Sequence, residues 1–264
     1  MSDPRAIERL FPSVEKPGRY TGGEWNAIVK DPSRTRISVA LAFPDVYEIG
    51  MSYLGQKILY ALLNERPEFR AERVFAPWPD MEEALRIAGE PLFSLENRTP
   101  LSAFDVVGFS LLYELNYSNV LTMLDLGGIT LRAGDRRDDE PLVLAGGPAV
   151  FNPEPVAVYF DAFVAGDGEE AFPEILDLWA ELKAKGTPRP DRIRALAGLR
   201  GVYVPSLYEI RAGERSPLQV VRPLRVGGGT DGRPGETARR PDRSHWAGNR
   251  NSSRLARPEL ARRP

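Results

Sequence analysis

The sequence predicts an α/β protein built on a doubly wound, mostly parallel β-sheet with helices on both faces. Strand-like and helix-like patterns alternate at least four times within the first 185 residues. Such alternation is typical of parallel strands that are connected through helices. The first strong strand, 36–43 (RISVALAF), is apolar at most positions. A run of this kind indicates a central strand that is covered on both faces.

The elements follow from hydrophobic periodicity and from the residues that start and end helices. We expect strands at 36–43, 71–75, 104–112 and 141–148, a fifth strand from 161, and helices at 51–65, 80–89, 113–128, 169–185 and 188–198. An edge strand is predicted at 91–96, and a last strand or hairpin at 201–210. Asp80 is the expected N-cap of its helix, and Gly89 is expected to end that helix.

Two helices carry apolar residues at helical spacing, which predicts the face that each turns to the sheet. In the helix after the first strand, these residues are Met51, Leu54, Ile58 and Leu62. In the predicted helix 113–128, they are Leu115, Val120, Leu121 and Leu124.

Composition divides the chain into four parts: an N-terminal extension (1–36), an α/β domain (37–210), a linker (211–224) and a tail (225–264). Gly, Pro and Arg make up 20 of the 40 tail residues, and the tail has a net charge of +6 against −8 for the rest. This composition predicts disorder. With 30 Arg against 5 Lys in the chain, the tail suggests a frameshifted, GC-rich coding sequence. The alternative is a native basic tail that contacts RNA or a partner.

Residue types that are missing exclude several kinds of site. The chain has no Cys, and His245 is its only His. Disulfides, thiolate-bound zinc or iron–sulfur clusters, Cys nucleophiles and Ser-His-Asp triads are therefore excluded in these 264 residues. A net charge of −2 gives no indication of nucleic-acid binding. Without a membrane-spanning apolar run or a secretory signal, we expect a cytoplasmic location.

Four short motifs follow predicted strands. In doubly wound sheets, ligands bind beyond the carboxyl ends of the strands. The motifs are Asp45-Val46-Tyr47-Glu48-Ile49-Gly50, Ser110-Leu111-Leu112, Gly146-Gly147 and Gly166-Asp167-Gly168-Glu169-Glu170. The candidate cofactor-binding residues are Asp45, Tyr47, Gly50, Met51, Ser52, Ser110, Leu112, Gly146, Gly147, Gly166, Gly168 and Glu169; no catalytic or metal-binding residue is assigned. Further candidates for the lining of a pocket are Tyr47, Tyr53, Tyr113 and Tyr117, with Asn116 and Asn119 as weaker ones.

A family resemblance runs over about residues 16–210. The stretches that carry it are KPGRYTGGEWN, FPDVYEIGMSYLGQKILYALLN, AERVFAPWPDME, PLFSLENRTPLSAFDVVGFSLLYELNYSNVLTMLDLGGI, LAGGPAVFNPEPVAVYFDAF and GDGEEAF. They resemble the N-terminal, cobalamin-binding-like domain of a bacterial group of fused, mostly uncharacterised radical SAM proteins. The resemblance implies a flavodoxin-like or Rossmann-like domain of the cobalamin-binding type. It also implies that the chain stops before a radical SAM barrel, its expected partner, which would hold a [4Fe–4S] cluster and S-adenosylmethionine.

The resemblance implies cobalamin as the cofactor, with one departure. The first motif is similar to the D-x-H-x-x-G loop of these domains, but Tyr47 stands where His would ligate cobalt. A phenolate ligand needs a pKa brought down from about 10, so we expect a corrinoid without a protein ligand on its lower face. Gly146 and Gly147 would let the nucleotide tail approach the backbone, and Ser110 would hydrogen-bond it.

Simpler structural explanations exist for each motif. Gly146-Gly147-Pro148 also fits a turn, Ser110 a bond within its own loop, and Gly50 close helix packing. Asp167 fits the N-cap of a helix with acidic residues in its first turn.

Two hypotheses for function remain open, and the sequence argues against a third, a flavodoxin-like or receiver-type protein. The chain is either a cobalamin-binding-type lobe that does no chemistry alone, or a docking or substrate-gating lobe of the same fold without a cofactor. A receiver domain would need Asp where Ser110 stands. A dinucleotide-binding fold would need G-x-G-x-x-G after the first strand, and a flavodoxin would need a Ser/Thr-rich phosphate loop there. The substrate is not indicated.

Overall fold

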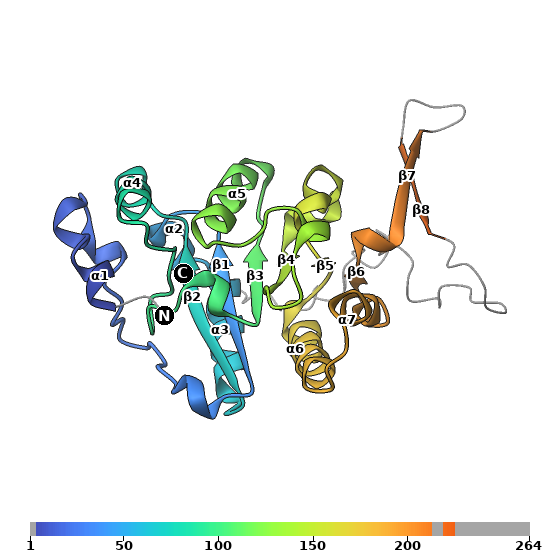
Figure 1. The fold of residues 1–264 in the computed structure, drawn as a ribbon, viewed down its shortest axis with the longest axis horizontal. Helices are drawn as coiled ribbons and strands as arrows, with labels where there is room; N and C mark the ends of the chain where they lie inside the picture. The colour runs from blue at the N-terminus through green and yellow to red at the C-terminus, as the bar shows by residue number, and fades with distance from the viewer. Residues whose placement is uncertain (1–3, 213–218, 225–264) are drawn as a thin grey trace, which may run out of the picture.

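The computed structural model describes residues 4–212 and 219–224, and it contains one six-stranded sheet in the order β2-β1-β3-β4-β5-β6 (Figure 1). The strands are β1 (Ile37–Phe43), β2 (Phe69–Phe75), β3 (Val106–Ser110), β4 (Leu142–Gly146), β5 (Ala162–Val164) and β6 (Val202–Tyr203). The first five are parallel, and β6 runs antiparallel to β5. The predicted α/β class and the doubly wound, mostly parallel sheet are therefore confirmed.

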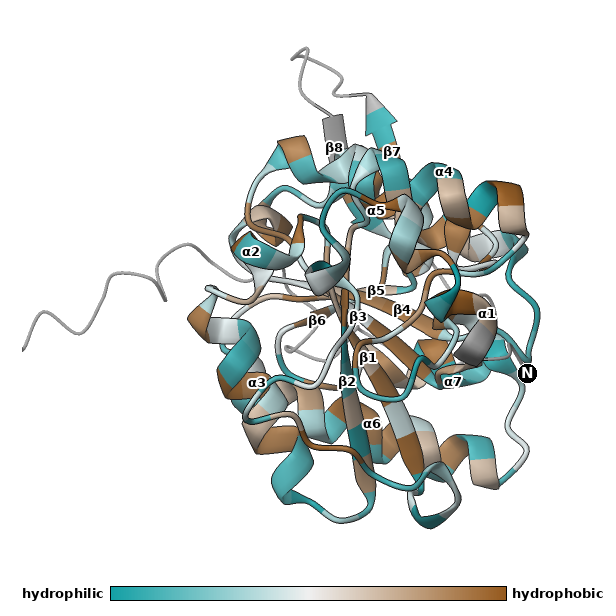
Figure 2. Cartoon of the chain, turned by 90° about the vertical axis from the view of Figure 1, so that its left-hand side faces the viewer, coloured by the Kyte–Doolittle hydropathy of each residue, from teal (hydrophilic) through white to brown (hydrophobic). Residues whose placement is uncertain are grey.

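Helices cover both faces of this sheet, which explains why β1 is buried at every position. One face packs against α3 (Leu54–Glu65), α6 (Gly168–Ala184) and α7 (Arg189–Leu196), and the other against α4 (Pro79–Ala88) and α5 (Tyr117–Leu126). Alternate strand residues divide between these two cores: Val39 and Leu41 face the first group, while Ala40 and Ala42 face the second. In Figure 2, the strands and the helix faces turned to them carry most of the apolar residues.

Short elements connect the long ones. The α-helical turns are α1 (Pro4–Glu8) and α2 (Tyr47–Gly50), and the 3₁₀ turns are Phe11–Ser13, Pro17–Arg19, Pro32–Arg34, Leu101–Ala103, Glu114–Asn116, Ala133–Asp135, Pro148–Phe151, Glu154–Tyr159 and Pro205–Leu207. Within the described residues, every helix is too short or too polar to cross a membrane.

The predicted inward face of α3 is wrong in part: Met51 and Leu62 pack against buried clusters as predicted, but Leu54 and Ile58 do not. Leu54 and Ile58 are 66% and 39% exposed, and the buried residues are Gln56, Tyr60, Leu63 and Asn64. The physical reason is that two polar side chains of α3 form hydrogen bonds with the sheet. Nε2 of Gln56 donates to the Leu41 carbonyl at 2.9 Å, and Nδ2 of Asn64 donates to the Ala71 carbonyl at 3.0 Å. Two amide side chains therefore turn the helix so that its Leu54–Ile58 stripe faces outward.

Two further predictions are corrected and one is confirmed. Leu115 is 83% exposed because a 3₁₀ turn precedes α5, whereas Val120 and Leu124 are buried as expected. The N-cap of α4 is Trp78, and the Asp80 carboxylate instead accepts from the Glu15 amide at 2.7 Å. Gly89 does end α4, with φ at +66°.

The segment 91–96 is no regular strand: it holds one isolated bridge, from Phe93 to Pro100. It still lies along the outer edge of β2, because the Leu95 amide donates to the Arg73 carbonyl at 3.0 Å. Glu96 Oε2 accepts from the Arg73 amide, and Nζ of Lys30 donates to the Phe69 carbonyl at 2.6 Å. Side chains thus cap this edge of the sheet.

Two further strands, β7 (Tyr208–Ala212) and β8 (Gln219–Pro223), pair with each other antiparallel in a separate two-stranded sheet. β7 begins within the predicted domain (37–210), and β8 lies within the predicted linker (211–224). The predicted tail, 225–264, lies outside the described residues, and its composition-based disorder stays a prediction.

Candidate functional site

The carboxyl ends of the three central strands meet at one edge of the sheet, as the motif positions predicted. Ser110 at the end of β3 pairs with Gly146 at the end of β4. The Leu111 amide donates to the Gly146 carbonyl at 2.8 Å, and the Ala149 amide donates to the Leu111 carbonyl at 3.1 Å. The loops that follow β3 and β4 are therefore bonded to each other.

The loop after β1 joins the same group of loops. Asn116 and Asn119 each donate a side-chain N–H to the Pro44 carbonyl, at 3.0 and 2.9 Å. These two asparagines hold the chain in place, which is a structural role rather than the pocket-lining role considered from the sequence.

A cavity of about 220 Å³ opens at this edge, between the sheet and helices α3 and α6. Strand ends and the first turns of the two helices line it. The lining residues are Leu41, Tyr53, Gly55, Leu59, Gly108, Phe109, Ser110, Leu144, Ala145, Gly146, Gly147, Val164, Gly166, Asp167, Gly168, Glu169 and Phe172. Six of the candidate cofactor-binding residues belong to this lining: Ser110, Gly146, Gly147, Gly166, Gly168 and Glu169.

Glycine stands at two adjacent positions of the lining, 146 and 147, for different structural reasons. At Gly147, φ is +103° and an added Cβ would lie 2.6 Å from the Leu111 carbonyl oxygen, so the turn itself requires glycine. At Gly146, the nearest atom to an added Cβ is the Val164 carbonyl oxygen at 3.9 Å. Packing does not require glycine at 146, and the missing side chain keeps the cavity open.

The polar groups of the cavity are a hydroxyl and two carboxylates. Among the described residues, none forms a hydrogen bond with the Ser110 hydroxyl, in contrast to the loop-internal bond considered from the sequence. Asp167 stands at the N-cap of α6, but its side chain makes no capping bond, so the predicted capping role is corrected. Asp167 and Glu169 are exposed, and no lining residue that the structure describes is basic.

Six other candidate residues lie outside the cavity, in and beside the loop after β1: Asp45, Tyr47, Gly50, Met51, Ser52 and Leu112. A Cβ on Gly50 would overlap the Phe75 ring, so close packing explains this glycine. Met51 Sδ accepts from Nη1 of Arg73 at 3.3 Å, and the Ser52 hydroxyl donates to the Ile49 carbonyl at 2.7 Å. These contacts hold the loop in place.

Tyr47 lies away from the cavity. Its ring packs edge-on against Phe75 at 5.6 Å between centroids, beside Arg19 and Tyr20. Burial raises the pKa of Tyr47, and the nearby Glu24 carboxylate raises it further. The phenol therefore stays protonated at neutral pH and has neither the charge nor the position of a metal ligand. Of the four tyrosines considered from the sequence, Tyr53 alone lines the cavity.

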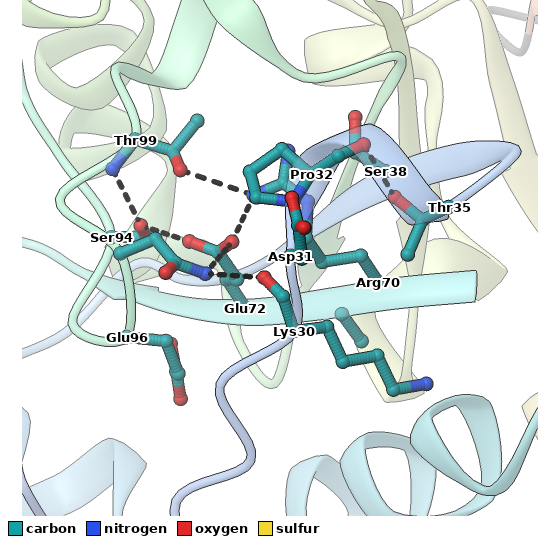
Figure 3. Close-up of polar contacts among 12 residues, drawn as sticks. Lys30, Asp31, Pro32, Thr35, Ser38, Arg70, Glu72, Ser94, Glu96 and Thr99 are labelled. Atoms are coloured by element: carbon teal, nitrogen blue, oxygen red, sulfur yellow. Dashed lines mark hydrogen bonds and ion pairs between the residues drawn. The ribbon is translucent and has the colours of Figure 1, made fainter. Parts of the chain in front are cut away.

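A buried charge network on the edge strand β2 was missed by sequence analysis. Glu72 on β2 is fully buried and pairs with Arg70, and it accepts hydrogen bonds from Ser94 and Asn97 (Figure 3). Arg70 also donates to the Thr99 hydroxyl at 3.1 Å. The signal was the run of charges in FRAERVF, which is unusual for a buried strand. The network fastens segment 94–99 to β2 and does not reach the cavity.

Comparison with known families adds to this geometry. Residues 55–205 match the family described as radical SAM proteins, N-terminal, and the match spans more than half of the chain. The chain belongs to this family. No curated protein and no solved structure matches the sequence.

The matched range, 55–205, includes the candidate residues that line the cavity but not those of the loop after β1. The radical SAM N-terminal region, 55–205, includes Ser110, the Gly146–Gly147 pair and the turn 166–169, and hence most of the cavity. The loop after β1, with Asp45 and Tyr47, precedes it. Membership in the radical SAM N-terminal family therefore covers the cavity rather than the loop that departs from the cobalamin pattern.

Proposed function

We propose that this chain is the N-terminal lobe of a radical SAM protein, and that its cavity holds the nucleotide tail of a corrinoid such as cobalamin. The observation that carries the proposal is the open space at Gly146, beside a Ser110 hydroxyl without a partner among the described residues. A volume of about 220 Å³ suits one part of such a ligand, since sites for whole drug-sized molecules start at about 300 Å³.

The residues present fit the tail better than they fit the cobalt ion. The backbone at Gly146 and Gly147 allows close approach of a flat group, and Ser110 offers a donor and an acceptor at the cavity wall. The loop after β1 supplies no imidazole, and Tyr47 lies against Phe75. The corrinoid would therefore be held through its tail by Ser110, Gly146 and Gly147. When bound, a corrinoid supplies the organometallic chemistry, while the protein orients it.

The catalytic partner in this proposal is a radical SAM barrel. The chain has no Cys, so a thiolate-bound [4Fe–4S] cluster, and the S-adenosylmethionine that it would bind, belong to another part of the protein. We expect this chain, incubated with S-adenosylmethionine and dithionite, to form no 5′-deoxyadenosine. Formation of that product would contradict a lobe without chemistry of its own.

The test of the corrinoid proposal is retention of colour after desalting. The purified chain is mixed with hydroxocobalamin, desalted, and its visible spectrum recorded beside those of Gly146→Leu and Gly134→Leu. Gly146→Leu fills the cavity, whereas Gly134 lies in an exposed turn where an added Cβ has no atom within 4 Å. We expect near-stoichiometric corrin absorbance for the wild type and Gly134→Leu, and loss for Gly146→Leu with unchanged circular dichroism.

A second candidate is a docking or substrate-gating lobe that binds no cofactor. The observation that favours it is Tyr47, which replaces the expected His and faces away from the cavity. A colourless wild-type chain after desalting would reject the corrinoid proposal and leave this candidate. Equal retention by wild type and Gly146→Leu would reject the cavity as the site of binding.

A further inference from the structure

The β7–β8 pair stands away from the six-stranded sheet and its helices (Figure 1). Its base is attached to the body: the ring of Tyr208 packs against that of Tyr203 at 5.0 Å, and the Leu224 amide donates to the Leu207 carbonyl at 2.8 Å. A two-stranded sheet alone is only marginally stable in water, and a third strand or a covering element stabilises it. This element is therefore suited to pairing with a further strand.

The hydrogen-bond pattern shows which groups are available. The bond from Leu224 to Leu207 marks these two residues as a hydrogen-bonded pair, and in an antiparallel ladder such pairs alternate. Glu209 and Arg211 therefore direct their backbone groups toward β8. Ile210 directs its N–H and C=O away from β8, to the free edge of β7.

The two edges of this small sheet are not equivalent. On β8, Pro223 stands opposite Tyr208 at a position that faces outward, and it has no N–H to offer. Proline and charges are the usual ways to block an edge strand, so Glu209 and Arg211 disfavour pairing of β7 with any strand that lacks the complementary charges. The described part of β7 contains no proline, and its Ile210 side chain is 49% exposed. The edge of β2 in the main sheet, by contrast, is capped by Glu96 and Lys30. Of the three edges compared, those of β8, β2 and β7, the edge of β7 is therefore the one best able to pair with another strand.

The sequence of β7 is complementary to itself. An antiparallel pair of two β7 strands with its twofold axis at Ile210 places Glu209 opposite Arg211 of the partner subunit, and the reverse. These are non-hydrogen-bonded positions, where side chains lie closest, and opposite charges there are favourable. We propose that β7 pairs antiparallel with β7 of a second copy of this chain about Ile210, which forms a four-stranded sheet.

The contact is small, so the dimer is weak. Five residues per strand are far fewer than the about 20–30 residues a side of a standard specific interface, so we expect weak association. A twofold axis explains why the same strand supplies both charges, since such an interface uses one surface twice.

The test is sedimentation equilibrium of the whole chain between about 10 µM and 1 mM. Ile210→Pro removes the outward N–H that the ladder with β8 does not use, and Ile210→Val retains it. We expect dimerisation at least ~10-fold weaker for Ile210→Pro and little changed for Ile210→Val. A wild type that stays monomeric at 1 mM, or a dimer that tolerates Ile210→Pro, would overturn the proposal.

Charge reversal tests the same contact with the backbone unchanged, although each variant also loses the 2.8 Å ion pair between Arg211 and Glu209 within β7. Arg211→Glu places two carboxylates opposite each other across the axis, and Glu209→Arg places two guanidinium groups there. Each variant alone should dimerise at least ~10-fold more weakly, whereas an equimolar mixture restores both ion pairs and should associate like the wild type. A mixture that associates no better than its components contradicts pairing about Ile210.

Discussion

The phenol of Tyr113 donates a 2.9 Å hydrogen bond to Oδ2 of Asp45, which joins the loop after β3 to the loop after β1. The Oδ1 atom of the same carboxylate accepts from the Val46 amide at 2.8 Å. In the cobalamin pattern, the equivalent Asp would orient a His ligand two residues later. Here Tyr47 points elsewhere, and Asp45 bonds a tyrosine from the neighbouring strand end. Asp45 thus fastens the loop after β1 to the loop after β3.

This bond predicts a measurable titration. The pKa of Tyr113 is raised above its ordinary value, first by the hydrogen bond to Asp45. Asp45→Ala removes the acceptor and its charge, so the pKa of Tyr113 should fall toward about 10. The measurement is an NMR titration of ring-labelled tyrosine, with Tyr113→Phe to assign the resonance. An unchanged Tyr113 titration in Asp45→Ala would show that the bond does not form in solution.

The buried pair on β2 predicts a large and asymmetric loss of stability. Arg70 and Glu72 (Figure 3) are 5% and 0% exposed. Glu72 also accepts from Nδ2 of Asn97 at 2.8 Å. Glu72→Ala leaves a buried guanidinium without its counter-charge, which costs about 3–5 kcal/mol. Replacing both partners by apolar residues, as in Arg70→Met/Glu72→Leu, removes that unpaired charge and should cost less than Glu72→Ala alone. Urea unfolding measures both, and a double variant less stable than Glu72→Ala contradicts this account.

Alkaline pH should destabilise the protein through Tyr60. Burial raises its pKa to about 12, while its hydroxyl accepts from the Ile28 amide at 2.7 Å. An unfolded tyrosine titrates near 10. The folded state holds the proton more tightly, so the contribution is complete below about pH 10 and is lost as pH rises toward 12. The loss is on the order of 2 kcal/mol.

The comparison that isolates this effect is wild type against Tyr60→Phe, in urea unfolding from pH 8 to 11.5. The difference in unfolding free energy between the two should stay constant up to about pH 10 and shrink above it. A difference that does not change with pH would assign the alkaline loss to other groups.

The order and type of the main elements were predictable because they depend on period and on residue type. The apolar run of β1 requires cover on both faces, and α6 has acids in its first turn and Lys183 in its last. The strand-end rule then located Ser110 and Gly146, which line the cavity. The reason for each glycine was not predictable, since Gly50 packs against Phe75 and Gly146 faces open space. That distinction depends on neighbours distant in sequence.

Polar side chains account for the main errors of the sequence-based predictions. Gln56 and Asn64 are not among the residues predicted to face inward, yet each bonds a strand carbonyl and is buried. Arg70 and Glu72 fit a surface strand by type, but segment 94–99 covers them. Hydrophobic periodicity has no means of recognising a buried polar group whose partner lies elsewhere in the chain.

The orientation of α3 is tested by two leucines on the same helix. Leu54 is 66% exposed and Leu63 is fully buried. Leu54→Ala should change the unfolding free energy by no more than about 0.5 kcal/mol. Leu63→Ala, which creates a cavity against the sheet, should cost about 2–5 kcal/mol. The residue type, the substitution and the helix are the same, so the difference reports burial alone. Equal costs, or a larger one at Leu54, would show that the Leu54–Ile58 stripe faces the sheet and that Gln56 and Asn64 do not hold the helix as described.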